Sequence, residues 1–183
     1  MLKHAFVVVG LILGFAGVVH AQALDGPFQV RAVPSLKSKD AIVVSNDGAS
    51  STVASPQNGL VCANTYAFAS DTGLLLDCCS CPVPANAQFS IAVLSDLLEN
   101  AKPKPKSVVL KLMATTGTSG VCNPTTVGTG SNVFMTGMVS WWKGETPFTP
   151  ATLSAAELSA VSTQCTTKQP SGRICSSCVP PPA

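Results

Sequence analysis

Histidine is nearly absent from this chain of 183 residues, and both copies, His4 and His20, lie close to the N-terminus. Beyond them the chain has no imidazole, which excludes a Ser-His-Asp triad, a Cys-His pair and a histidine-ligated metal. Charge is also scarce, at 11% of residues with a formal net charge of +2. The only local basic run, Lys102, Lys104 and Lys106, alternates with prolines and is typical of a stiff, solvated loop. No nucleic-acid partner is expected, because phosphate binding needs a concentrated basic face.

The longest hydrophobic run lies at the N-terminus and has the pattern of a signal peptide. A short basic segment precedes an apolar run over residues 5–19, and the small residues of Ala21-Gln22-Ala23 follow it. The run is shorter than the roughly 20 residues that a transmembrane anchor needs. The sequence therefore predicts a signal peptide at 1–23 and a single domain at 24–183. It predicts no membrane span after cleavage, and a secreted, periplasmic or cell-surface location.

The cysteine content predicts a covalently stapled domain. All eight cysteines lie beyond the predicted cleavage site: Cys62, Cys78, Cys79, Cys81, Cys122, Cys165, Cys175 and Cys178. An even number in an exported chain predicts up to four disulfides. Residues 60–68 and 74–81 are strand-like around a turn, and if Ala69 and Leu74 flank that turn, Cys62 faces Cys81. Cys78 and Cys79 should point to opposite faces and take different partners. The last three cysteines are expected to tie a C-terminal helix to the tail.

Two other uses of these cysteines stay open. Cys78 with Cys81, and Cys175 with Cys178, have the two-residue gap of a zinc knuckle, and four thiolates could close a tetrahedral site. The same gaps match thiol oxidoreductases, but reactive thiols sit at helix N-termini, whereas these follow a strand or lie in a Gly, Ser and Pro-rich tail. Oxidation outside the cytoplasm competes with metal loading, so disulfides are favoured and no metal or cofactor is expected.

The hydrophobic pattern predicts a mainly β fold. Runs of β-branched and apolar residues, separated by Gly, Pro, Asn and Ser clusters, lie at 41–45, 60–68, 74–79, 88–93, 107–115 and 132–141. Residues 95–100 are compatible with one helical turn. A capping box at Ser154 and Glu157 starts one helix, on which Leu158, Val161 and Cys165 share a face. We expect an immunoglobulin-like β-sandwich, stapled by disulfides, with this helix docked on it and a Pro-rich tail.

Carboxylates are the remaining catalytic candidates, and none forms a convincing pair. The candidates are Asp71, Asp77, Asp96, Glu99, Glu145 and Glu157. Asp71 is typical of a turn, Asp96 of a first helical turn and Glu157 of a helix cap. Asp77, on a strand beside Cys78, is the hardest to dismiss, and a structural role as a hydrogen-bond acceptor is favoured. No catalytic residue is assigned, and we do not expect an enzyme.

Trp141 and Trp142 are the candidate ligand-binding residues. Neighbouring residues of a strand point to opposite faces, so one indole should fill the core while the other lies outside. An exposed indole stacks on a sugar or anchors a partner protein. The competing interpretation, in which the C-terminal helix covers the outer tryptophan, is favoured because only one or two residues carry the signal.

Several segments resemble those of uncharacterised exported bacterial proteins. The shared features are an Asn-Gly-x-x-Cys-x-Asn-x-Tyr-x-Phe segment at 58–68, the Cys-Cys-Ser-Cys-Pro run at 78–82, and a Glu-Thr-Pro-Phe-x-Pro-Ala-Thr-Leu-Ser-x-x-Glu-Leu segment at 145–158. The pair Cys175 and Cys178 is also shared, so the resemblance covers most of the chain. It implies one stapled domain and brings no activity, substrate or catalytic residue.

Three hypotheses of function follow. The leading one is a non-enzymatic, extracytoplasmic structural or adhesion-type interaction module, whose partner is a protein or glycan surface. The second is a carbohydrate-binding module that uses Trp141 or Trp142. The third is a thiol-redox or metal-binding protein centred on Cys78 to Cys81. Self-association through a sheet edge is compatible with the first.

Overall fold

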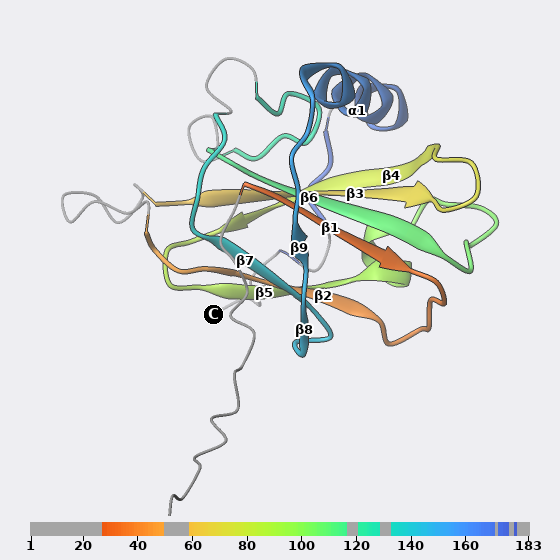
Figure 1. Cartoon of the computed structure of the whole chain (residues 1–183), viewed down its shortest axis with the longest axis horizontal. Helices are drawn as coiled ribbons and strands as arrows, with labels where there is room; N and C mark the ends of the chain where they lie inside the picture. The colour runs from red at the N-terminus through yellow and green to blue at the C-terminus, as the bar shows by residue number, and fades with distance from the viewer. Residues whose placement is uncertain are drawn as a thin grey trace, which may run out of the picture.

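The β-rich pattern of the sequence folds into two antiparallel sheets with one helix on the outside, as the computed structural model shows (Figure 1). The structure describes residues 27–49, 59–116, 121–128, 133–170, 172–175 and 178, and the predicted signal peptide lies outside them. The elements are β1 (Phe28–Val33), β2 (Ala41–Asn46), β3 (Val61–Ala69), β4 (Leu75–Val83), β5 (Gln88–Ala92), the short π-helix η1 (Val93–Leu97), β6 (Val108–Thr115), β7 (Met138–Trp142), β8 (Thr146–Pro147), β9 (Thr149–Pro150) and α1 (Ala155–Lys168).

The strand order places every long strand in one of two packed sheets. One sheet has five strands in the order β4-β3-β6-β1-β9, and the other has four in the order β5-β2-β7-β8. The mainly β class, the sandwich and the C-terminal helix are therefore confirmed. The two sheets are compatible with an immunoglobulin-like arrangement, which stays a prediction. Five of the six predicted runs form strands, while the run at 132–141 forms a strand only from Met138 onward.

Apolar side chains form two separate cores because the five-stranded sheet is covered on both faces. Ile42, Leu110 and Leu112 belong to the core between the sheets. Tyr66 and Met113 point to the other face, where they pack against α1 and the loop before β7. This double cover explains why β3 is buried along nearly its whole length rather than at alternate positions. The four-stranded sheet, in contrast, has one core face only.

The helix begins where the capping pattern places it. The Ser154 side chain accepts a hydrogen bond from the Glu157 N–H at 3.1 Å. Only this half of the capping box forms, because the Glu157 carboxylate pairs with Lys111 on β6 instead of returning to Ser154. Val161 and Cys165 are buried on the face that docks on the five-stranded sheet. Among the described residues, no helix has the length and apolar character needed to cross a membrane.

The predicted pairing of Cys62 with Cys81 is wrong, and a β-bulge is the reason. Close to the turn the register is the expected one, since Ala69 N–H donates to Leu74 O and Phe68 lies opposite Leu75. One extra residue then enters β4, because Ala67 lies opposite Asp77, and every later pair moves by one position. Cys62 consequently lies opposite Pro82, and its disulfide partner is Cys122.

All eight cysteines are paired, and three of the four disulfides bind β4 to the end of the chain. The pairs are Cys62–Cys122, Cys78–Cys165, Cys79–Cys175 and Cys81–Cys178, with Cα–Cα separations of 5.2 to 5.9 Å. Cys78 and Cys79 do take partners on opposite faces, as predicted. The expectation that the last three cysteines join the helix to the tail is wrong, because helix and tail are each joined to β4. Four disulfides indicate folding in an oxidising compartment.

Candidate binding surface

The two tryptophans lie on opposite faces of β7, as predicted. Trp142 is 8% exposed and belongs to the core between the sheets, where the Arg31 guanidinium lies 5.7 Å from its ring. Trp141 points to the outer face of the four-stranded sheet and is half-buried. The expectation that the C-terminal helix covers the outer tryptophan is wrong, because α1 packs on the five-stranded sheet, on the opposite side of the sandwich (Figure 1). Trp142 is thereby a core residue, and Trp141 is the remaining ligand-binding candidate.

Small and apolar side chains lie beside Trp141 on the outer face of the four-stranded sheet. In the sheet, Trp141 lies opposite Val43 of β2 and Pro147 of β8. The outward residues of β2, β5 and β7 are half-buried or exposed, and we call this set the Trp141 face: Ala41, Val43, Ser45, Gln88, Ser90, Ala92, Val139 and Trp141. Within the part of the chain that the structure describes, no helix or strand packs across this face. Val43 lies at its centre, between the Trp141 indole of β7 and the Ser90 hydroxyl of β5.

A fixed ion pair lies beside Trp142, on the core side of the four-stranded sheet. Lys143 follows β7, and its Nζ lies 2.7 Å from the Oδ1 of Asp40, which is almost fully buried. Burial by itself would raise the pKa of the Asp40 carboxyl. The Lys143 ammonium and the Lys37 N–H, which donates to Asp40 Oδ2 at 2.9 Å, outweigh burial and lower that pKa below its ordinary value. Asp40 therefore stays ionised and holds the Lys143 ammonium in place, 5.9 Å from the Trp142 ring.

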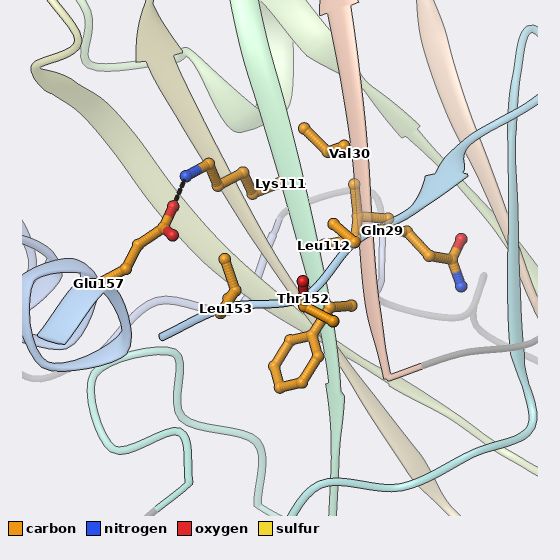
Figure 2. A pocket seen from close by; sticks show the side chains of 9 residues that line it. Gln29, Val30, Lys111, Leu112, Thr152, Leu153 and Glu157 are labelled. Atoms are coloured by element: carbon orange, nitrogen blue, oxygen red, sulfur yellow. Dashed lines mark hydrogen bonds and ion pairs between the residues drawn. The ribbon is translucent and has the colours of Figure 1, made fainter. Parts of the chain in front are cut away.

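A groove beneath α1, which contains a charged pair, is the second candidate site. Figure 2 shows Glu157 of α1 and Lys111 of β6 pointing toward each other across this groove. Cavities of about 160 Å³ and about 310 Å³ each include both residues in their lining, so the ion pair lies between them. The Lys111 ammonium also lies 5.1 Å from the Phe68 ring. A charged ligand would have to break a pair that already neutralises both groups, so the groove is the weaker candidate.

Asp77 has the structural role that the sequence predicts. Its carboxylate accepts hydrogen bonds from the Cys78 N–H at 2.9 Å and from the Gln169 amide at 3.0 Å. Arg173 in the tail lies 3.6 Å from its second oxygen, and the same guanidinium donates to the Asp96 and Leu97 carbonyl oxygens of η1. Arg173 thus fastens the tail to η1 and β4. Sequence reasoning missed this residue, because an isolated arginine in a tail carries no pattern.

The zinc-knuckle spacing suggests a site formed by Cys78, Cys81, Cys175 and Cys178, but these four sulfur atoms do not come together. Cys78 turns toward α1, whereas Cys81 turns toward the core between the sheets. The sulfurs of Cys81, Cys175 and Cys178 lie within 4.8 Å of one another, and all three are buried and oxidised in disulfides. A metal needs thiolates, which these disulfides do not supply. The folded, oxidised chain therefore offers no free thiol for the thiol-redox or metal hypothesis.

Comparisons with protein-family models, with curated proteins and with solved structures found no match for this chain. The resemblance to exported bacterial proteins therefore stays a prediction, and the functional argument depends on the surface itself.

Proposed function

We propose that the chain is an exported, non-enzymatic interaction module that presents the Trp141 face to the surface of a partner protein. The observation that supports it best is the asymmetry of the sandwich. One outer face lies under α1 and the loop before β7, while no described element covers the other. Tryptophan is enriched among the residues that dominate binding energy, because its large ring loses little conformational entropy when buried.

The disulfides support both the location and the rigidity of this module. Three of them fix β4 to α1 and the tail, so the sandwich behind the Trp141 face is covalently braced. A rigid surface loses less entropy on binding than a mobile one. We place the protein outside the cytoplasm, either secreted, periplasmic or on the cell surface, because such disulfides persist in oxidising compartments.

A carbohydrate ligand is the second candidate, and one observation favours it. The half-buried indole of Trp141 lies on the outer face of the four-stranded sheet, with hydroxyl groups of Ser45 and Ser90 on the same face. A sugar ring can stack on such an indole while its hydroxyls bind neighbouring polar groups. The second tryptophan of the sequence hypothesis does not contribute, since Trp142 lies in the core.

The test is binding of labelled, oxidised protein to intact cell envelopes of the producing organism, together with a glycan array. Trp141→Ala should weaken envelope binding at least about 30-fold, because a hot-spot tryptophan contributes about 2 kcal/mol or more. Leu74→Ala is the matched control, since Leu74 is 63% exposed at the turn between β3 and β4. Equal binding by Trp141→Ala and the unmodified protein would overturn the proposal. Array signals that disappear with Trp141→Ala would favour the carbohydrate ligand.

A further inference from the structure

Three of the four sheet edges carry a device that prevents further strand pairing. The β4 edge is covered by the tail, because Ser80 N–H donates to Arg173 O at 2.8 Å and Cys175 N–H donates to Ser80 O at 3.2 Å. The edges at β8 and β9 are only two residues long, and each contains a proline. Covering segments, short strands and prolines are the usual means by which proteins protect an edge.

The fourth edge, β5, has none of these devices. Its sequence from Gln88 to Ala92 contains neither a charged residue nor a proline. The bonds from Asn46 N–H to Ala87 O and from Val93 N–H to Asp40 O fix which main-chain groups face β2. Because these groups alternate along an antiparallel strand, those of Phe89 and Ile91 bond β2, and those of Gln88, Ser90 and Ala92 point outward. The Ala92 carbonyl is already in use, because Ala92 is the N-cap of η1 and accepts its first main-chain bond. No described segment pairs with these outward groups.

We propose that β5 pairs with the β5 of a second copy of this chain, in antiparallel register about Ser90. In this register Ser90 lies opposite Ser90, and Gln88 lies opposite Ala92 of the other copy. The outward N–H groups of Ser90 and Ala92 then meet the carbonyls of Ser90 and Gln88 in the other copy, and the four-stranded sheets of two copies join into one continuous sheet. The exposed side chains along β5 are neutral, so no like charges oppose each other.

The second copy fits this edge because the edge is complementary to itself. Five residues form a small interface, so we expect a weak dimer whose population depends on protein concentration. The pairing would also place two Trp141 faces on the same side of one sheet. A role of the two faces in partner binding rests on the proposed function, whereas the pairing itself does not.

A charge exchange at Ser90 tests the register. Sedimentation velocity of the purified, oxidised protein should show a dimer whose fraction increases between about 10 µM and about 1 mM. Ser90→Lys and Ser90→Asp should each raise the dissociation constant about two- to fivefold, because the two-fold axis opposes like charges. Ser38→Lys is the control, since it adds the same charge in the exposed loop between β1 and β2. A mixture of Ser90→Lys and Ser90→Asp should restore the dimer.

Three results would overturn the proposal. One is an unmodified protein that stays monomeric over the whole range. Another is association that the Ser90 substitutions leave unchanged, which would place the contact elsewhere. The third is slow hydrogen exchange of the Ser90 and Ala92 amides in the monomer, which would show that the chain covers its own edge. If the pairing is correct, exchange at these amides slows only as the dimer forms.

Discussion

We expect the loss in the free energy of unfolding, when a single disulfide is removed, to decrease as the sequence separation of its two cysteines increases. Cys62–Cys122 spans 60 residues and Cys81–Cys178 spans 97. In the chain-entropy account the longer loop contributes more, because closing it removes more freedom from the unfolded chain. The structure changes this expectation, since Cys79–Cys175 already joins the same two segments.

The expected magnitudes follow from the loop that each crosslink closes while the others stay intact. With Cys79–Cys175 in place, Cys81–Cys178 closes a ring of roughly seven residues and contributes about 2 kcal/mol. No other disulfide shortens the path from Cys62 to Cys122, so that crosslink keeps its full value of about 4 kcal/mol. The two paired replacements by alanine should therefore differ by about 2 kcal/mol in the free energy of unfolding.

Urea unfolding of the two double variants under non-oxidising, non-reducing conditions measures this difference. For a chain of this size, 2 kcal/mol corresponds to a shift of about 1 M in the urea midpoint. The sulfurs removed are buried in both variants, so the loss of packing is similar and largely cancels. Equal destabilisation of the two variants, or a greater loss for Cys81/Cys178, would refute the argument that Cys79–Cys175 shortens the loop that Cys81–Cys178 closes.

Two substitutions test buried polar groups away from the Trp141 face. Asp40→Asn removes a carboxyl whose pKa is lowered in the folded protein from its ordinary 3.8. The stabilisation by the ionised carboxylate is therefore fully present above pH 3.8, and it is lost as the pH falls through the folded pKa. The difference in free energy of unfolding between the variant and the unmodified protein, measured by urea unfolding, should be largest at neutral pH and smaller at about pH 3. An equal difference at both pH values would contradict this. Tyr66→Phe removes a buried hydroxyl that donates to Pro124 O at 2.7 Å, which should cost about 1–3 kcal/mol without altering envelope binding. An unchanged urea midpoint in Tyr66→Phe would show that the Pro124 carbonyl finds another donor.

The sequence predicts strands well where apolar residues dominate, and it fails where a polar side chain enters the core. The run that becomes β1 went unrecognised because Gln29 interrupts its apolar pattern. In the structure Gln29 is 2% exposed, and its amide donates to Met138 O at 2.7 Å, which satisfies the group inside the protein. The partner lies 109 positions away, so no local pattern could reveal it.

The same limit applies to the disulfides and to the binding surface. The turn between β3 and β4 fixes the first pairs of the register, but the bulge near Asp77 depends on contacts that a turn pattern does not contain. Alternation along β7 predicts that one tryptophan faces outward, but only the position of α1 on the other sheet decides that Trp141 is uncovered. The bare edge of β5 likewise depends on strand order, which joins segments distant in sequence.

The connectivity of the disulfides also sets a condition on how the chain matures. Cys62, Cys78, Cys79 and Cys81 are synthesised first, and each has its partner among the four cysteines that are synthesised later. Early oxidation can therefore join only wrong partners, and thiol–disulfide exchange must later replace them. A chain that oxidises this early needs an isomerase as well as an oxidant, and only a chain synthesised through Cys178 can reach its final covalent form.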